Sequence, residues 1–389
     1  MPKKNIRLFK PSLGNEEIQA IKKVFKRSWI GFGPEVKKFE NSFSKFIGLK
    51  YSVGVTSCSA ALHIALASKN FKKKKKVLVP AMTFSATAAA ALYNGLDPVF
   101  VDINEYDLNI NFDDLKKKYS KDCVAVIPVH VGGHPCEMEK IIPWAKKKNL
   151  LVIEDCAHTI GGIYKGKMLG TWGDVSCFSF EEKKMLTTGD GGMICTNNKS
   201  LAAKFRTLSF HGWDRDPWYR YKKSISSKNL NERHWYYQIK DLGFKYNMND
   251  LMAVIGQAQL KKLNSFNFKR NLGVKKYLNG IKDCKNIQPY FLKHHKYIAY
   301  WMFAIRTKKR DQLITFLKKK GIATSVYWIP VPMHPLYQKF KSKIPVTKKV
   351  WRELVTLPLF SDIKIEEINY IVKYIKEFDQ QLAKNDSRR

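Results

Sequence analysis

Short apolar runs rich in β-branched residues recur through the first half of the chain, and helix-like segments separate many of them. The runs are 51–57, 77–80, 98–102, 123–130, 151–155, 175–180 and 192–196. Runs of this length and composition are typical of buried strands. Residues 59–69, 85–94 and 137–148 have the composition of helices. Strands that alternate with helices predict an α/β fold, with a mostly parallel sheet covered by helices on both faces.

A further helix is expected near the N-terminus, over residues 18–25. Its apolar residues recur at helical spacing and would share one face; they are Ile18, Ile21, Val24 and Phe25. Ser12 or Asn15 could accept hydrogen bonds from the first free backbone N–H groups, and so mark where this helix begins.

The chain changes character after about residue 200. Residues 211–240 are aromatic and basic with little periodicity, and a segment of that length is typical of a functional loop. Its aromatic residues could contact a substrate or pack against a partner subunit. A strong helix follows over 250–263, and strand-like and helix-like runs then alternate again. We therefore expect a large domain over 1–250 and a smaller C-terminal α/β domain over 251–389.

The balance of charge is strongly basic, with 70 basic against 33 acidic residues and a formal charge of +37. A basic protein can bind nucleic acid by neutralising its phosphates. Nucleic-acid readers, however, usually gather arginines in a patch. Here only about a dozen of the basic residues are arginine, and the lysines are spread along the whole chain. Specific nucleic-acid binding is not expected, although the positive field would attract a phosphorylated small molecule.

Cysteine usage and hydropathy bear on the cellular location. No run approaches the roughly 18 apolar residues of a membrane span, and no apolar signal segment follows the first residues. The seven cysteines are scattered and form no CxxC pair, which favours a reducing cytoplasm over a disulfide framework. His130 and His134 could ligate a metal, but no third ligand is apparent nearby, so none is expected.

Polar side chains follow several of the predicted strands, at the edge where parallel sheets bind ligands. Asp155 and His158 end the run 151–155, Ser179 ends the run 175–180, and Lys184 lies five residues further on. Residues 57–60 join a strand to a helix, where free backbone N–H groups can hold an anion. These are the parts of a pyridoxal phosphate site, in which a lysine forms a Schiff base and a carboxylate keeps the pyridine nitrogen protonated. Taken singly, each residue could equally be a turn or a helix cap.

The chain resembles the sugar aminotransferases of the DegT/DnrJ/EryC1/StrS family, almost from end to end. The resemblance rests on blocks that follow the family's order, among them GVTSCSAALHIAL (54–66), IEDCAHTIGG (153–162), FSFEEKKMLTTGDGGMICT (178–196) and LGFKYNMNDLMAVIGQAQL (242–260). It implies the fold-type-I architecture of aspartate aminotransferase, pyridoxal 5′-phosphate as cofactor, and a homodimer whose sites are shared between subunits.

The resemblance also assigns roles to residues. Counted from FSF or back from TTG, the family's Schiff-base lysine falls on Lys184. If this segment is extended, Lys183 would point to its other side and be structural. Asp155 matches the partner of the pyridine nitrogen, and His158 matches a position beside the ring. The other implied cofactor contacts are the backbone of Ser59 and Ala60 on the phosphate, Phe84 stacked on the ring, the Ser179 hydroxyl, and Asn247 reaching the phosphate of the neighbouring subunit.

The implied reaction moves an amino group from an amino acid, L-glutamate, to a keto- or aldehyde-sugar for amino-sugar and surface-glycan biosynthesis. Family members commonly carry His after FSF, whereas this chain has Glu181. A carboxylate there would repel a nucleotide diphosphate. Either Glu181 faces away from the substrate and pairs with a local lysine, and the substrate is nucleotide-linked, or the substrate is a free keto-sugar acid.

Two other activities remain as alternatives. Relatives that remove a sugar hydroxyl carry His in place of the lysine, so Lys184 favours transamination over dehydration. A DNA-binding regulator would need an additional helix-turn-helix domain, for which the sequence gives no signal.

Overall fold

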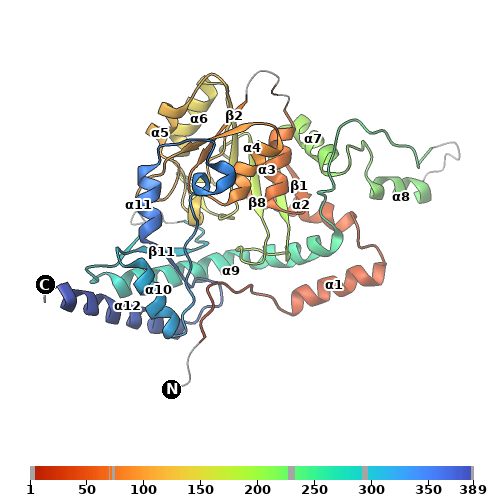
Figure 1. Ribbon diagram of the computed structural model, residues 1–389. Coiled ribbons are helices and arrows are strands. Elements are labelled where there is room, and N and C mark those ends of the chain that lie inside the picture. Colours follow the sequence, from red (N-terminus) through yellow and green to blue (C-terminus); the bar gives the residue numbers. More distant parts are fainter. Residues whose placement is uncertain (1–4, 70, 72–74, 227–232, 291–296, 387–389) are drawn as a thin grey trace.

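The computed structural model describes residues 5–69, 71, 75–226, 233–290 and 297–386 (Figure 1). Its centre is a seven-stranded sheet in the order β1-β9-β8-β5-β4-β2-β3. The strands are β1 (Tyr51–Val55), β2 (Lys76–Pro80), β3 (Asp97–Val101), β4 (Cys123–Val126), β5 (Leu151–Asp155), β8 (Val175–Ser179) and β9 (Gly192–Thr196). Only β9 runs antiparallel to its neighbours within this sheet. The predicted mostly parallel sheet is therefore confirmed, with all seven expected strands.

Helices cover both faces of this sheet. They are α2 (Pro34–Ile47), α3 (Cys58–Ala67), α4 (Ser85–Tyr93), α5 (Phe112–Lys118), α6 (Met138–Lys147) and α7 (Lys199–Ser209). Successive residues of a strand point to opposite faces. In β2, Val77 and Val79 belong to the core formed with α3, α4 and α7, whereas Leu78 belongs to the core formed with α5 and α6. Residues of α2 pack beside β8, where the Phe43 and Phe178 rings meet edge-on at 5.0 Å.

The C-terminal part is smaller and is built on a second sheet. Its antiparallel strands are β10 (Gln288–Pro289), β11 (Phe303–Arg306) and β12 (Leu354–Leu357), and its helices are α10 (Arg310–Lys319), α11 (Pro345–Glu353) and α12 (Ile365–Asp386). The long helix α9 (Asp250–Ile281) contacts α1 and α2 as well as α12, and Figure 1 shows it running between the two parts. A domain boundary at residue 250 stays a prediction, because α9 begins there and contacts both parts.

The N-terminal helix is longer than predicted and begins differently. Helix α1 covers Asn15–Arg27, and its N-cap is Gly14, whose N–H donates to Glu17 Oε2 at 2.7 Å. The predicted caps at Ser12 and Asn15 are therefore wrong. The predicted apolar face is only partly buried, because Val24 is buried whereas Ile18 and Phe25 are exposed.

The aromatic segment 211–240 contains helix α8 (Pro217–Ser226), which lies apart from the central sheet at the right of Figure 1; residues 227–232 lie outside the described part. Trp213 stacks on Tyr237 at 3.9 Å, and Trp218 meets Trp29 edge-on at 5.0 Å. These rings thus pack on one another and on the N-terminal region. A short hairpin, β6 (Ile163–Tyr164) and β7 (Lys167–Met168), was not expected. Among the described helices, none is long and apolar enough to cross a membrane.

Candidate active site

A cavity of about 360 Å³ opens at the carboxyl ends of β5 and β8, beside the first turns of α3 and α4. Ligands bind at this edge of parallel α/β sheets, and the volume suits a small cofactor or substrate. Six of the eight residues predicted for the site line it: Ser59, Phe84, Asp155, His158, Ser179 and Lys184. The structure thus brings together residues that are up to 125 positions apart in the sequence.

Asp155 ends strand β5 and supplies a buried carboxylate. Its Oδ1 accepts a hydrogen bond from the Ala157 N–H at 3.1 Å, and its Oδ2 accepts one from the Thr87 hydroxyl at 2.9 Å. Burial raises the pKa of Asp155, while those two hydrogen bonds and the positive charge of Lys184 lower it, leaving the pKa above its usual value. Such a carboxylate would be stabilised by a cationic group brought into the cavity.

Lys184 lies in a turn after β8, and its N–H donates to the Glu181 carbonyl at 2.9 Å. Its ammonium is 4.3 Å from the centroid of the Trp301 ring. Burial lowers the pKa of Lys184; the negative charges of Glu181 and Asp155 raise it, but the net shift is downward. A lysine with a lowered pKa is more readily available as the neutral, nucleophilic amine.

His158 is almost fully buried against aromatic rings. It stacks on Trp301 at 4.1 Å and on Trp328 at 5.1 Å, with interplanar angles of 11° and 14°. Burial, followed by the charge of Lys184, holds the pKa of His158 well below its usual value, so the ring is neutral. Its Nδ1 has no hydrogen-bond partner among the described residues. A buried polar atom of this kind requires a partner, which a bound ligand could supply.

The first turn of helix α3 closes one end of the cavity. The Ser57 side chain caps this helix by accepting from the Ala60 N–H at 3.1 Å. Gly192 in β9 lies close behind, so close that a Cβ there would be 2.5 Å from the Ser57 carbonyl carbon. Glycine therefore lets the strand approach the turn, and the helix N-terminus faces the cavity as a potential anion site.

Glu181 and Lys183, in the same turn as Lys184, also line the cavity. Lys183 was expected to point away from the site if the segment after β8 were extended; the segment turns instead, and Lys183 lines the cavity. Lys183 Nζ lies 3.6 Å from Glu181 Oε1, and the Lys183 N–H donates to Glu181 Oε2 at 3.0 Å. Glu181 therefore pairs with a local lysine, as predicted, but it lines the cavity, so the prediction that it faces away from the substrate is wrong.

Two predicted residues lie outside the cavity lining. The N–H of Ala60 is engaged by Ser57, as described above. Asn247 forms a bridge to Val55 of β1; its Oδ1 accepts from Lys245 Nζ at 2.8 Å, and its Nδ2 donates to the Met248 carbonyl at 3.0 Å. Their roles at the phosphate, including that of Asn247 across a subunit interface, stay predictions.

Sequence reasoning did not find several cavity residues. They are Thr83 of the β2–α4 connection, Thr87 in the first turn of α4, Asp190, and the aromatic residues Trp301, Tyr327 and Trp328. The aromatic residues come from the C-terminal part, more than 100 positions after Lys184, and their local sequence reads as ordinary strand. No local pattern could have assigned them to the site.

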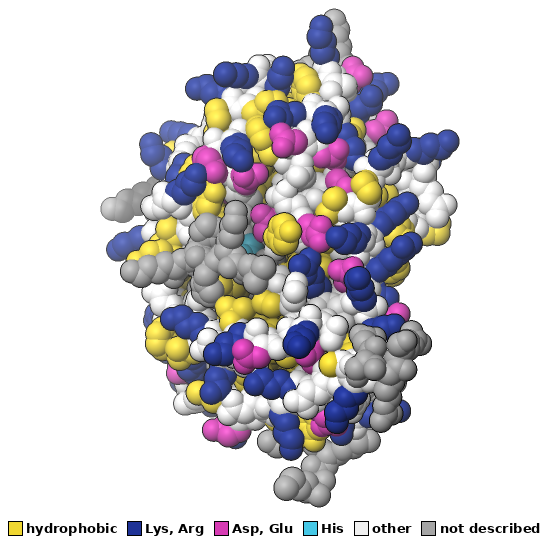
Figure 2. All heavy atoms as spheres, turned by 90° about the vertical axis from the view of Figure 1, so that its left-hand side faces the viewer, with side chains coloured by type: hydrophobic (Ala, Val, Ile, Leu, Met, Phe, Trp, Pro, Cys, Tyr) yellow, Lys and Arg dark blue, Asp and Glu magenta, His cyan; other side chains and the backbone are white. Residues whose placement is uncertain are grey.

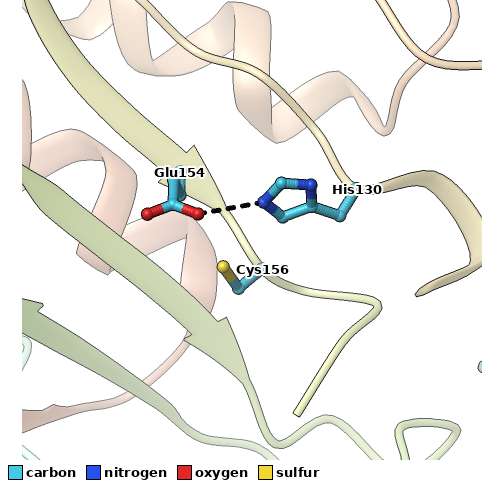
Figure 3. Close-up of side chains that lie close together, drawn as sticks. All are labelled: His130, Glu154 and Cys156. Carbon is cyan, nitrogen blue, oxygen red and sulfur yellow. Dashed lines mark hydrogen bonds and ion pairs between the residues drawn. The ribbon is translucent and has the colours of Figure 1, made fainter. Parts of the chain in front are cut away.

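His130, Glu154 and Cys156 form a buried cluster close to the cavity, with ligand-type atoms all within 4.8 Å of one another (Figure 3). His130 Nε2 donates to Glu154 Oε2 at 3.1 Å, and His130 Nδ1 accepts from the Cys136 N–H at 3.1 Å. Three backbone N–H groups, those of Gly170, Trp172 and Gly173, complete the hydrogen bonding of the Glu154 carboxylate. The cluster is therefore a hydrogen-bonded anchor for the 170–173 loop.

Basic side chains are distributed widely over the surface. Figure 2 shows lysine and arginine side chains scattered over one face, interspersed with acidic and apolar ones. Several pair with acids, such as Arg206 with Glu40 and Lys349 with Glu105. On this face the charge forms no single stripe of the kind that tracks a nucleic-acid backbone.

Comparisons with known proteins agree with this site. A profile of the DegT/DnrJ/EryC1/StrS aminotransferase family matches residues 11–376. The spore coat polysaccharide biosynthesis protein SpsC of Bacillus subtilis is 34% identical over 378 residues, covering 94% of this chain and 95% of its own. The GDP-perosamine synthase of Escherichia coli O157:H7 is 33% identical over 386 residues, covering 96% and 99%.

The fold has solved counterparts. Spr1654 from Streptococcus pneumoniae, solved in its PLP form, superposes with a TM-score of 0.86 at 26% identity, covering 97% of this chain and 99% of its own. The seven-stranded sheet, the cavity with Lys184 and Asp155, and these matches across nearly the whole chain lead to one conclusion: the chain belongs to the DegT/DnrJ/EryC1/StrS family of aminotransferases.

Proposed function

We propose that this protein transfers an amino group from L-glutamate to a keto- or aldehyde-sugar, with pyridoxal 5′-phosphate as cofactor. The observation that carries the proposal is the presence of Lys184 and Asp155 in one cavity at the carboxyl edge of the sheet. A lysine with a lowered pKa and a buried carboxylate are the two groups that pyridoxal phosphate needs from a protein.

The residues of the cavity fit this cofactor. Asp155 is a buried carboxylate that would hold a protonated pyridine nitrogen, and the unpartnered Nδ1 of His158 would lie beside the ring. The turn at Ser59 and Ala60, with Ser179, would hold the phosphate at the N-terminus of α3. Phe84 is 55% exposed although it lines the cavity, so its ring face is available for stacking.

When bound, the cofactor would withdraw electrons from the carbon that carries the amino group. The chain's own contribution would be the proton transfer at that carbon. Lys184 Nζ would anchor the cofactor covalently and, once free, take the proton and return it as base and acid. The neutral His158 and the stack of rings behind it would keep water out of this side of the cavity.

We propose a nucleotide-linked keto-sugar as the acceptor. One support is the GDP-perosamine synthase among the relatives, and the polysaccharide role in the name of SpsC points to the same class of pathway. A second is the Lys183–Glu181 pair, because the ammonium offsets the carboxylate that would otherwise repel a diphosphate. The free keto-sugar acid stays the alternative acceptor.

We further propose a cytoplasmic homodimer with sites shared between subunits. All seven cysteines are free in the structure, and six of them are buried, which is compatible with a reducing compartment. Asn247, outside the cavity of its own chain, would be the residue that serves the neighbouring subunit.

The test is amination of a panel of 3-keto and 4-keto nucleotide sugars and free keto-sugar acids, with ¹⁵N-labelled L-glutamate as donor and product mass as readout. Wild-type protein and Lys183→Ala should incorporate ¹⁵N, and Lys184→Ala should not. Amination of free sugar acids alone would overturn the nucleotide-linked acceptor. Loss of oxygen without incorporation of nitrogen would show a dehydratase, and no product with any acceptor would overturn the proposal as a whole.

A further inference from the structure

Trp301 is held in place through each of its polar atoms. Its backbone N–H donates to the Gly132 carbonyl at 3.0 Å, and its own carbonyl accepts from Arg270 Nη1 at 3.2 Å. Its indole Nε1–H donates to the Lys183 carbonyl at 2.9 Å. Because Trp301 is also buried, its ring has a fixed position relative to the lysine turn.

The Trp301 ring is also the aromatic neighbour of the Lys184 ammonium. The distance from Lys184 Nζ to the ring centroid is 4.3 Å, within the range of a cation–π interaction. The rings of Phe9 and His158 lie nearly parallel to that of Trp301, at 5.3 Å and 4.1 Å. Packing from Phe9 in the N-terminal segment and from His158 in the loop after β5 thus keeps the Trp301 ring from turning.

We infer that Trp301 is a positioning residue for the free side chain of Lys184. The indole N–H of Trp301 fixes the backbone of the turn at Lys183. The face of the Trp301 ring holds the Lys184 ammonium at the wall of the cavity. A residue of the C-terminal part of the chain would thereby control a lysine of the large sheet. The importance of this control for catalysis rests on the proposed function, whereas the two contacts themselves do not.

Several titratable groups also surround the Lys184 ammonium, and they act on it independently of the Trp301 ring. Glu181 and Lys183 face it from its own turn and Asp155 faces it from the end of β5, all three charged, whereas the Cys58 thiol, whose pKa burial raises, faces it from α3 as a neutral group. His158, beside it, is neutral, and Asp190 lines the same cavity. Trp301 carries no charge, so changing the electron density of its ring alters the cation–π contact and leaves every one of these charges in place.

The first test therefore replaces Trp301, through an amber codon, by mono- to tetrafluorinated tryptophan in the full chain freed of cofactor. Fluorine weakens the negative face of the ring with little change in size. The pH dependence of Lys184 acetylation, resolved by peptide mass spectrometry, gives its apparent pKa. We expect this pKa to fall stepwise with each fluorine, by about half a unit in total.

The matched control carries the same fluorinated residues at Trp328. Trp328 stacks on the same histidine and lines the same cavity, but no contact of its ring with the Lys184 ammonium is found in the described part of the chain. Its fluorination should leave the acetylation profile unchanged. An unchanged profile for the Trp301 series, or an equal shift in the Trp328 series, would overturn the inference.

The second test addresses the indole hydrogen bond. Trp301→Phe keeps an aromatic ring but removes the N–H that binds the Lys183 carbonyl, so amide hydrogen exchange over residues 181–186 should become roughly fivefold faster. Trp328→Phe is the control and should not change that exchange. Exchange at the wild-type rate in Trp301→Phe would refute the positioning of the turn. Both readouts use cofactor-free protein, so they hold or fail whether or not the chain aminates a sugar.

Discussion

The hydroxyl of Thr87 donates a hydrogen bond to Oδ2 of Asp155, over 2.9 Å, in the interior of the protein. Thr87 lies in the first turn of α4 and is fully buried, and its oxygen is 2.8 Å from that of Thr83. The contact ties α4 to the end of β5. It also stabilises a carboxylate whose pKa burial raises, so Thr87 favours the ionised form of Asp155.

Replacing Thr87 by Val should therefore be costly despite the similar shape of the two side chains. The buried carboxylate would lose a donor, and the free energy of unfolding should fall by about 1–3 kcal/mol. Urea denaturation at pH 7 measures this change. Thr87→Ser keeps the hydroxyl and is the control; equal losses in the two variants would mean that the methyl group, and not the hydrogen bond, is responsible.

The central sheet could be predicted because buried parallel strands have a strong local signature. The runs VLVP (77–80) and LVI (151–153) are short, continuous and apolar, and both lie in strands of the structure. The start of α1 could not be predicted from side-chain caps, because Gly14 relies on the carboxylate of Glu17. The exposure of Ile18 and Phe25 likewise depends on what packs against the helix, which periodicity does not encode.

Residues on strand ends could be assigned to the site, because the carboxyl edge of the sheet follows from its topology. Asp155 and Ser179 are examples. Trp301 and Trp328 could not be assigned, since only the docking of the C-terminal part brings them to Lys184. The direction of Lys183 could not be predicted for a local reason: it depends on whether the segment is extended, and the chain turns there, with the Lys184 N–H donating to the Glu181 carbonyl.

Lys184 should make the cofactor-free protein less stable at neutral pH than at alkaline pH. Burial lowers its pKa in the folded state below the ordinary value of 10.5. Below the pKa that Lys184 has in the folded protein, its side chain is protonated in both the folded and the unfolded protein, and the folded protein bears the cost of a buried ammonium. Above pH 10.5 the side chain is neutral in both, and that cost is gone. The contribution of Lys184 to stability therefore rises with pH between its lowered pKa and 10.5.

Lys184→Met should accordingly stabilise the cofactor-free protein at pH 7, with a gain that shrinks as the pH approaches 10.5. Urea denaturation of both proteins from pH 7 to pH 10 measures the difference in the free energy of unfolding. Lys183→Met removes an ammonium from the same turn, where 48% of the side chain is exposed, and serves as control. A gain for Lys184→Met that grows with pH would contradict the assigned cause.

The Lys183–Glu181 pair should govern how the cavity tolerates negative charge. Lys183→Met leaves the Glu181 carboxylate unbalanced, so KM for an anionic acceptor should rise about two- to fivefold at low salt, the range of a partly exposed pair. Added salt should diminish the effect. The double variant Lys183→Met/Glu181→Gln removes both charges and should restore KM to near the wild-type value. If the double variant had a KM as high as that of Lys183→Met alone, Lys183 would act on the substrate directly.

Gly192 should be intolerant of any side chain, for a reason of space. A Cβ would lie 2.5 Å from the Ser57 carbonyl carbon and 2.7 Å from the Cys58 nitrogen, both backbone atoms of the turn that opens α3. Gly192→Ala should therefore displace this turn, lower the free energy of unfolding by about 1–3 kcal/mol, and weaken pyridoxal phosphate binding about tenfold or more. Thermal unfolding and a titration of cofactor fluorescence measure the two effects.

Gly31→Ala is the control, because nothing lies within 4 Å of its Cβ position, and it should change stability by less than about 0.5 kcal/mol. If Gly192→Ala lost stability but bound the cofactor normally, the turn at Ser57 would be a structural contact and not the phosphate site.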